Sequence, residues 1–540
     1  MGAMRLVYVC LVMFCLMLIS GYVFHAVPSE EAVSAWGIVL CSEGYFMGGC
    51  LDNGSLYVCG YFRNYTGGKY TPKIFVAKYD IVEEKLLWLK VIEEFRGWAY
   101  SILVVNGRVF VSGFVAPSEG FIVCLDSSGS FLWGYLVECP LYGLLSFEDK
   151  VLAYGRGLFI LFSRDGEVIK AVFVEVKNAA GGWVPVDAWG AQYIDGKIYA
   201  VGYQARLLSA EKKFGRVFDG HLICLSKDLE VIWAVGFGSR EHNEYFRGIC
   251  VDHGSLYVCG FYQIYAEDKV VDQNIVVVEF NTNGSIKWAK SIDCSVHDYA
   301  SAVKVIHENI YVVGNSIGSF TAESSDFIIV KICKKNETSC FWTIGGNLSE
   351  FCWGAFFAEN GILIYGETST WAEKSASSKI KGYPIAVYWP LNSVGEIFWG
   401  KSGWESIKVK KHVSSKVIFL NFTVSKLLTR SRGIKYCKKY MFKLADQKVL
   451  AVSAKGNLTA VSLQKKVEGQ TSSQSAKEKE AAGKGKVSGG AKASGEEITV
   501  NVTLGALFLV AFITAVVAAL VLIVVVVYYF VKRRKRRSSI

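Results

Sequence analysis

The sequence GSLYVCGYF occurs at Gly54–Phe62, and the nearly identical GSLYVCGF occurs at Gly254–Phe261. Each copy begins at a turn and continues as a short, largely apolar strand that contains a glycine. Further copies begin at Gly107 (GRVFVSGF), Gly196 (GKIYAVGY) and Asn309 (NIYVVGN), and weaker copies begin at Lys150 (KVLAYG) and Gly361 (GILIYG). Their shared glycines are Gly60, Gly113, Gly155, Gly202, Gly260, Gly314 and Gly366, at spacings of 42 to 58 residues. This regular recurrence identifies an internal repeat.

Each glycine is followed by a second strand, a turn and a further strand that commonly ends in tryptophan, as in FIVCLDSSGSFLW. These tryptophans are Trp88, Trp133, Trp233, Trp288, Trp342 and Trp399, whereas the third unit has Lys170. Another strand precedes each turn, as in YFMGGCLDNG from Tyr45 and YFRGICVDHG from Tyr245. About four strands in a period near 52 residues indicate β-propeller blades.

The repeats predict an all-β, seven- to eight-bladed propeller over residues 28–463. An eighth, weaker unit is predicted from KVIFLNFTV at Lys416 and YMFKLADQKVLAV at Tyr440. The segment AWGIVL at Ala35–Leu40 resembles a Trp strand with no blade before it, and it would close the ring by completing the last blade. We expect the tryptophans to pack between neighbouring blades and the glycines to allow close backbone approach near the central channel.

Segments outside the repeats predict a membrane-anchored extracytoplasmic protein. Residues 1–27, with Arg5 before an apolar stretch, are typical of a signal peptide or signal anchor. Residues 464–500 are polar and predict a disordered stalk. Residues 501–531 predict a transmembrane helix, because Leu504–Val531 contains no charged residue. Six cations at Lys532–Arg537 then mark 532–540 as a basic cytoplasmic tail.

Eight Asn-x-Ser/Thr sequons agree with export and are candidates for N-glycosylation. They are Asn53, Asn64, Asn283, Asn336, Asn347, Asn421, Asn457 and Asn501. At Asn53 and Asn283 the same residues also form good turns.

The cysteines suggest disulfides in an oxidising exterior. Cys333 and Cys340 would lie opposite each other if the turn between them is centred on residues 336 and 337. The pairs Cys50 with Cys59 and Cys250 with Cys259 flank equivalent hairpin turns, where they are either bridged or small buried core residues.

The units resemble the β-propeller repeats of the PQQ-like and beta-propeller-repeat type, whose consensus is Tyr-Val-x-Gly followed by Asp-x-Phe-Val-x-Lys-Leu-Asp and a later Trp. SDFIIVKI at Ser325 and IFVAKYD at Ile74 match it best. With its signal, stalk, helix and basic tail, the chain further resembles archaeal membrane-anchored extracellular proteins. The resemblance implies a binding or scaffolding role.

No catalytic, cofactor-binding or metal-ligating residues are assigned, since the sequence has no zinc motif, nucleophile elbow or phosphate loop. Asp80, Asp126 and Asp165 either form turns or ligate calcium, and turns are favoured. We expect a cell-surface binding or scaffold protein that recognises protein or glycan through propeller loops, without catalysis, cofactor or nucleic acid. The alternatives are a membrane-tethered quinoprotein-like oxidoreductase or a glycan-active enzyme. A glycan-active enzyme would need paired carboxylates, for which Glu241, Glu244 and Asp252 are candidates.

Overall fold

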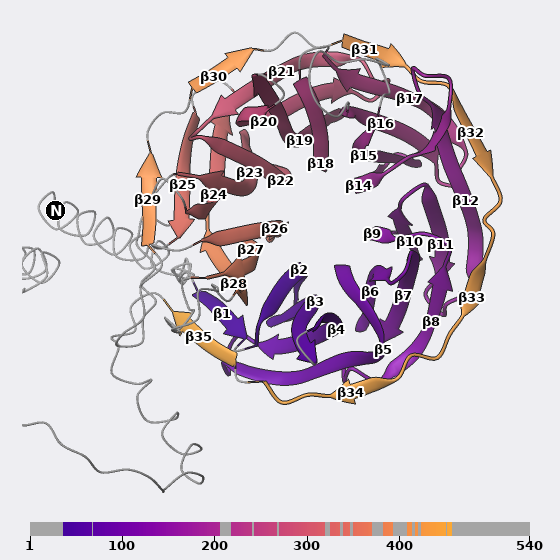
Figure 1. The fold of residues 1–540 in the computed structure, drawn as a ribbon, viewed down its shortest axis with the longest axis vertical. Coiled ribbons are helices and arrows are strands. Elements are labelled where there is room, and N and C mark those ends of the chain that lie inside the picture. Colours follow the sequence, from indigo (N-terminus) through magenta and orange to yellow (C-terminus); the bar gives the residue numbers. More distant parts are fainter. Residues whose placement is uncertain are drawn as a thin grey trace, which may run out of the picture. The chain divides into compact units, whose positions relative to one another are not determined.

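The computed structural model describes residues 36–40, 42–66, 69–205, 218–239, 242–266, 269–318, 324–334, 339–345, 349–369, 382–391, 408–412, 416–419, 423–449 and 451–455. All secondary-structure elements in these ranges are β-strands, and they are arranged as a ring around a common centre (Figure 1). None of the described residues belongs to a helix long and apolar enough to span a bilayer. The predicted signal (1–27), stalk (464–500), transmembrane helix (501–531) and tail (532–540) lie outside the described residues.

Consecutive strands pair as antiparallel meanders that run outward from the centre of the ring. The first comprises β2 (Gly44–Asp52), β3 (Ser55–Thr66), β4 (Lys69–Asp80) and the start of β5 (Lys85–Val105). The long strand β5 then changes partner from β4 to β6 near Arg96 and Gly97. Its second part begins the next meander, with β6 (Arg108–Val115), β7 (Glu119–Leu125) and β8 (Phe131–Val137).

The same meander recurs along the chain. The third comprises β9 (Leu141–Phe147), β10 (Lys150–Gly155), β11 (Leu158–Ser163) and β12 (Val168–Lys177), with the short β13 (Trp183–Pro185) beside β12. The fourth comprises β14 (Ala188–Ile194), β15 (Lys197–Ala205), β16 (Phe218–Ser226) and β17 (Val231–Gly238). The fifth comprises β18 (His242–Asp252), β19 (Ser255–Ala266), β20 (Lys269–Asn281) and β21 (Ile286–Asp293). The sixth comprises β22 (His297–Ile306), β23 (Asn309–Ile317), β24 (Ser325–Cys333) and β25 (Ser339–Gly345).

The last meander is completed by the N-terminal strand. β26 (Glu350–Phe357), β27 (Gly361–Thr368) and β28 (Tyr383–Pro390) come from the end of the repeat region. β1 (Trp36–Leu40) pairs antiparallel with β28, with Trp36 opposite Tyr388. The predicted closure by Ala35–Leu40 is therefore confirmed. β1 takes the outer position in this meander, which the sequence analysis had given to a strand ending at Trp399. Trp399 itself lies outside the described residues.

The segment Lys408–Lys455, here called the belt, adds an outermost strand to each meander (Figure 1). Its strands are β29 (Lys408–His412), β30 (Lys416–Phe419), β31 (Thr423–Lys426), β32 (Thr429–Arg432), β33 (Cys437–Lys439), β34 (Leu444–Asp446) and β35 (Ala451–Lys455). In that order they pair with β25, β21, β17, β12, β8, β5 and β1. The prediction of an eighth repeat from Lys416 and Tyr440 was therefore wrong. These short strands do not pair with one another as a blade, because each completes the edge of a different blade.

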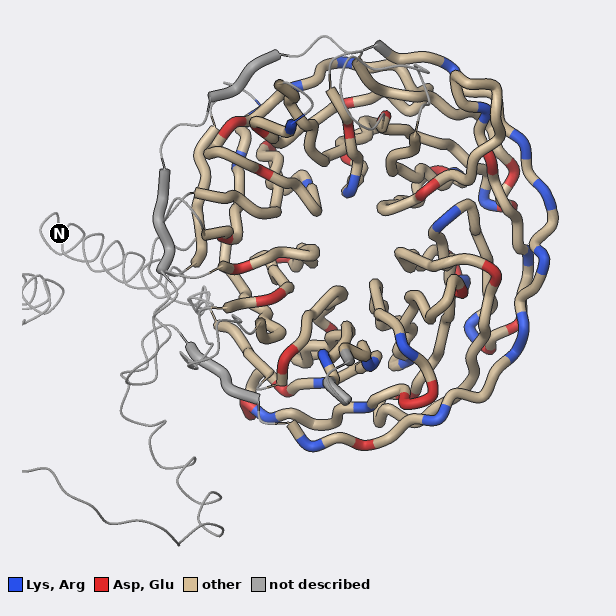
Figure 2. Tube along the Cα trace, viewed as in Figure 1, with Lys and Arg blue, Asp and Glu red and all other residues tan. Residues whose placement is uncertain are grey.

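The belt carries the positive charge of the chain. Residues 408–455 contain 13 Lys or Arg and a single acidic residue, Asp446, whereas the rest of the chain has 46 Lys or Arg and 47 Asp or Glu. Where the belt is coloured in Figure 2, basic residues accordingly lie along the outer rim. Two belt arginines bind acids of the strands beneath them, Arg430 to Glu175 and Arg432 to Glu138. Exposed lysines on an outermost strand also discourage edge-to-edge association with another chain.

Tryptophans of the outer strands pack against the turn of the next meander, as the sequence predicts. Trp133 donates a hydrogen bond from Nε1 to the carbonyl oxygen of Arg164 at 3.2 Å and stacks on Phe162. Turn glycines leave room for the indoles, and the pairs are Trp88 with Gly129, Trp133 with Gly166 and Trp233 with Gly284. A side chain at these glycines would collide with the ring, so the turn and the tryptophan are mutually required.

Candidate functional site at the centre of the ring

The innermost strand of each meander bulges at the same place. At this point the pairing register with the second strand skips one residue. The skipped residues are Met47, Tyr100, Tyr142, Trp189, Arg247, Ser301 and Trp353. A β-bulge re-aims the side chain of the extra residue. The repeat therefore delivers one side chain per meander to a common region.

The repeat glycines make these bulges possible. A Cβ atom on any of them would collide with a backbone carbonyl oxygen in the inner strand or directly before it, two residues before the bulged residue. The glycine and carbonyl pairs are Gly60 with Tyr45, Gly113 with Trp98, Gly155 with Pro140, Gly202 with Asp187, Gly260 with Tyr245, Gly314 with Tyr299 and Gly366 with Phe351. The predicted close backbone approach near the channel is thus confirmed, and its consequence is the bulge.

All the bulged residues line one cavity of about 280 Å³. Further aromatic residues complete its wall, namely Tyr154, Phe261, Tyr299, Phe351 and Tyr365. The lining contains one cation, Arg247, and no aspartate or glutamate. The cavity is therefore an aromatic chamber with a single positive charge.

The aromatic wall is held together by stacking on both faces of Trp189. Tyr142 stacks on this indole with ring centroids 4.2 Å apart and an interplanar angle of 5°. The guanidinium carbon of Arg247 lies 4.0 Å from the same indole. Tyr100 approaches Tyr142 and Trp189 edge-on, at 5.6 and 6.3 Å. Stacked and edge-to-face contacts of this kind fix ring orientation, so the wall is preorganised.

Burial keeps the cavity tyrosines in their neutral form. It raises the pKa of Tyr100 to about 12, and it raises the pKa of Tyr142 further. Next to Tyr142, burial also raises the pKa of Asp187 to about 6, although Arg156 at 4.0 Å opposes this shift. The tyrosine hydroxyls therefore remain available as hydrogen-bond donors at physiological pH.

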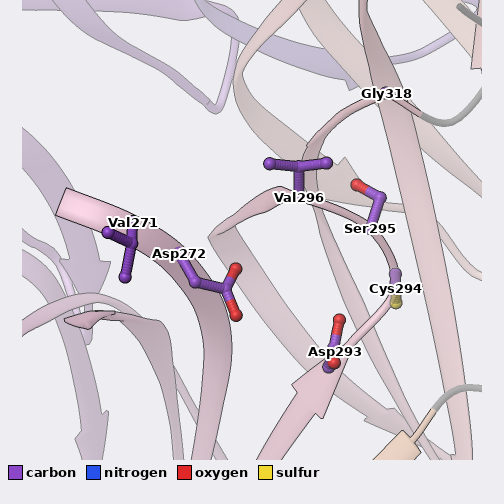
Figure 3. Close-up of a pocket in the computed structure, with 7 residues that line it drawn as sticks. All are labelled: Val271, Asp272, Asp293, Cys294, Ser295, Val296 and Gly318. Atoms are coloured by element: carbon purple, nitrogen blue, oxygen red, sulfur yellow. The ribbon is translucent and has the colours of Figure 1, made fainter. Parts of the chain in front are cut away.

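A second hollow lies between the fifth and sixth meanders, with a volume of about 520 Å³ (Figure 3). Val271 and Val296 form exposed apolar edges, and Asp272, Asp293 and Ser295 add polar groups. Ser295 is already bound, because its hydroxyl donates to Asp298 at 3.1 Å and lies 2.6 Å from the Ser316 hydroxyl. The hollow is open, and its serine shapes the loop.

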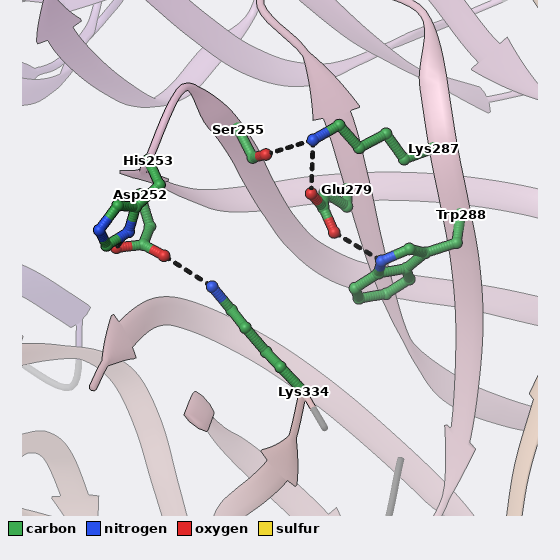
Figure 4. Close-up of polar contacts among 7 residues, drawn as sticks. All are labelled: Asp252, His253, Ser255, Glu279, Lys287, Trp288 and Lys334. Atoms are coloured by element: carbon green, nitrogen blue, oxygen red, sulfur yellow. Dashed lines mark hydrogen bonds and ion pairs between the residues drawn. The ribbon is translucent and has the colours of Figure 1, made fainter. Parts of the chain in front are cut away.

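The carboxylates considered for a glycan-active site do not line the central cavity. Glu241 lies outside the described residues, and Glu244 is buried, where it accepts hydrogen bonds from the backbone and hydroxyl of Ser239. Asp252 occupies a hairpin end, where Lys334 of the next meander binds it at 2.6 Å (Figure 4).

A neighbouring polar network holds an outer-strand tryptophan in place. Glu279 accepts hydrogen bonds from Trp288 Nε1 at 2.6 Å and from Lys287 at 3.0 Å (Figure 4). Lys287 in turn donates to the Ser255 hydroxyl at 2.6 Å. These contacts lie within the fifth meander, whereas the Lys334–Asp252 ion pair joins the fifth meander to the sixth.

The cysteines proposed as disulfide partners are free in the structure. Cys340 lies opposite Lys331, two residues from the predicted register with Cys333, so the expected direct opposition was wrong. Cys50 faces Tyr57 and Cys59 faces Gly48, and the same register holds in the equivalent hairpin of Cys250 and Cys259. These four thiols are buried, and burial raises their pKa values.

Three of the predicted glycosylation sequons fall in the described chain, and all three asparagines are exposed: Asn53, Asn64 and Asn283. The other five, Asn336, Asn347, Asn421, Asn457 and Asn501, lie outside the described residues. Glycosylation itself stays a prediction.

Two of the aspartates weighed as turn formers or calcium ligands cap turns. Asp126 accepts hydrogen bonds from the backbones of Ser128 and Ser130, and Asp80 accepts them from Val82 and Glu83. Asp165 does not occupy the equivalent position, which belongs to Ser163, and it pairs with Arg108 at 2.9 Å instead. No cluster of metal-ligating side chains occurs among the described residues.

The strand pairing places the chain in the class of all-β proteins with a β-propeller domain. No family model and no curated protein sequence matches it. Among solved structures, the WD40 domain of Neurospora crassa Pan2 is 11% identical, covering 68% of this chain and 99% of that domain, with a TM-score of 0.39. The β-propeller domain of the Trilobed protease from Pyrococcus furiosus, which has an open velcro topology, is 11% identical over 64% of this chain and 93% of that domain, with a TM-score of 0.35. The polysaccharide lyase Uly1 is 10% identical over 64% of this chain and 90% of that chain, with a TM-score of 0.33.

Residue composition alone did not single out the cavity residues, because they are chemically diverse. They share one sequence property: each lies 13 residues before its repeat glycine, from Met47 with Gly60 to Trp353 with Gly366. The hairpin between inner and second strand has constant length, so this spacing marks the channel position in every unit.

Proposed function

We propose that this protein is a non-catalytic binding protein that recognises a small ligand, or one residue of a larger protein or glycan, in the central cavity. The observation that carries the proposal is the convergence of one bulged residue from each meander on a single aromatic chamber. Enclosed, largely apolar pockets with a few convergent polar groups are the usual form of a ligand site. The stacked wall supports selective binding, because little order must be gained when a ligand enters.

Presentation at the cell surface is part of the proposal. Three sequence features support a single-pass anchor with the propeller outside: the apolar stretch after Arg5 within residues 1–27, the uncharged segment Leu504–Val531 and the cations at Lys532–Arg537. We also propose that the ring is complete with seven blades. Its support is that β1 fills the last meander and that a belt strand pairs with the outer strand of each.

Ligand binding can be tested with the full-length protein in detergent, screened against glycan and peptide arrays and followed by tryptophan fluorescence. Trp353→Ala should abolish binding of any hit, because it removes an indole from the cavity wall. Val271→Ala is the matched control, because it alters the hollow of Figure 3 and leaves the channel unchanged. Binding that survives Trp353→Ala and is lost in Val271→Ala would move the site to that hollow and overturn the proposal.

A further inference from the structure

Two residues of the cavity wall carry hydrogen-bond donors that lack acceptors. Two indole nitrogens, Trp189 Nε1 and Trp353 Nε1, are buried without a hydrogen-bond partner in the described part of the chain. Both residues line the cavity. A buried donor left unpaired costs about 1–3 kcal/mol, so such groups in a native protein are normally satisfied by water or a ligand.

The guanidinium of Arg247 is a third donor group without an acceptor. Its contacts within the described chain are with aromatic faces, at 4.0 Å from the Trp189 ring and 5.5 Å from the Tyr203 ring. Stacking engages the face of a guanidinium, while its N–H groups point outward along the edge. No described carboxylate lies within ion-pair distance of it, and the cavity lining contains none.

The nearest acids have other roles. Glu244, three residues before Arg247, accepts hydrogen bonds from the backbone and hydroxyl of Ser239. Asp187 is paired with Arg156 across the 4.0 Å contact and is not among the residues that line the cavity. The positive charge in the chamber is therefore uncompensated by the described protein groups around it.

We propose, building on the function proposed above, that the ligand carries an oxyanion held by Arg247 together with the indole N–H groups of Trp189 and Trp353. A planar guanidinium and additional N–H donors match the acceptor geometry of a carboxylate, sulfate or phosphate. The rest of the ligand packs on the tyrosine and tryptophan rings. A chamber of about 280 Å³ lies at the lower end of the usual range for ligand pockets, which selects a compact ligand.

Matched pairs of anionic and neutral probes test this inference with the full-length protein in detergent, by calorimetry and tryptophan fluorescence. The pairs are glucuronate with glucose and N-acetylglycine with N-acetylglycinamide, and inorganic phosphate is tested alone. At least one organic anion should bind at least about tenfold more tightly than its neutral partner. Phosphate, which has no neutral partner in this set, should show measurable binding if it is the anion recognised. The probe that binds identifies the oxyanion of the ligand as a sugar carboxylate, a peptide-like carboxylate or a phosphate.

Two kinds of variant separate charge recognition from folding. Arg247→Met should reduce anion affinity by about tenfold or more, whereas Arg247→Lys, which keeps the charge without the fork, should lose less. Trp353→Phe removes one N–H and keeps an aromatic ring. It should therefore lower the affinity for the anionic probe and leave the affinity for its neutral partner unchanged. Equal binding of both members of a pair, insensitive to Arg247→Met, would overturn the inference while leaving the binding function intact. Absence of binding by every probe, together with no hit in the array screen, would overturn both.

Discussion

Protonation of His221 is expected to make the propeller acid-sensitive. His221 lies in β16 opposite Gly202, a position that holds Phe75 and Phe121 in two other meanders. Its side chain is fully buried, and neither ring nitrogen has a hydrogen-bond partner in the described structure. Burial lowers the pKa of His221 to about 3, because the charged imidazolium would have to lose its hydration.

The magnitude follows from proton linkage. The pKa of an unfolded histidine is about 6.5, so between pH 6.5 and 3 the unfolded chain binds more protons than the folded chain. Folding stability therefore falls as the pH drops through this window, by about 1.4 kcal/mol for each pH unit. At pH 4.5, about two units below the unfolded pKa, the loss from His221 should be about 2–3 kcal/mol.

His221→Leu should remove this pH dependence, measured as the difference in urea-unfolding free energy between pH 7.5 and 4.5. His253→Asn is the matched control, because His253 is 91% exposed and Asn53 occupies the equivalent turn. Asp187 acts in the opposite direction, since its pKa is raised to about 6 and its contribution is lost as the pH rises through that value. Asp187 is present in the native protein, His221→Leu and His253→Asn, so its contribution to the unfolding free energy cancels when they are compared.

Two results would refute this reasoning. One is an equal loss of stability at pH 4.5 in the native protein and in His221→Leu. The other is a direct observation, by NMR of the histidine Cε1 protons, that His221 titrates near pH 6.5.

Four further measurements test the packing. Gly260→Ala should destabilise the fold by about 3 kcal/mol or more, because the new methyl group would collide with the Tyr245 carbonyl, whereas Gly433→Ala, with open space around it, should change the unfolding free energy little. Trp133→Ala should cost about 3–5 kcal/mol in denaturant unfolding, and a loss below 1 kcal/mol would contradict the blade-to-blade role assigned to the ring. Phe442→Ala in the belt, where the phenyl ring is 3% exposed, should cost a similar amount, and an unchanged midpoint would show that the belt does not stabilise the ring. Because the candidate cysteines are free, the unfolding free energy should be the same with and without reductant. A fall of about 2–5 kcal/mol in the unfolding free energy on adding reductant would show that a disulfide forms.

Local sequence patterns were sufficient for the repeating unit. Alternating apolar residues and turn signals located the strands, and Asn53-Gly54 forms the expected hairpin turn with φ angles of 46° and 72°. The tryptophans and the repeat glycines were also assigned their correct roles, because a residue that recurs once per unit must serve a contact that recurs once per unit.

The belt could not be recognised from its sequence. Its strands have ordinary strand patterns, and one such pattern does not specify its partner. The sequence pattern therefore assigns Lys416–Phe419 and Thr423–Lys426 to a single unit, yet they pair with β21 and β17 of different meanders. The register error at Cys340 has a similar origin, since a shift of turn position by one residue moves the opposing residue by two.

The candidate site depends on both the sequence and the tertiary structure. The sequence by itself determined the period, the glycine in each unit and the constant spacing of 13 residues to the inner strand. Only the tertiary structure decided that this residue is bulged and that its counterparts, such as Tyr142, Trp189 and Arg247, meet in one cavity. The reason is physical: a bulge is a property of two paired strands, and a chamber is a property of a closed ring, so neither exists within a single repeat.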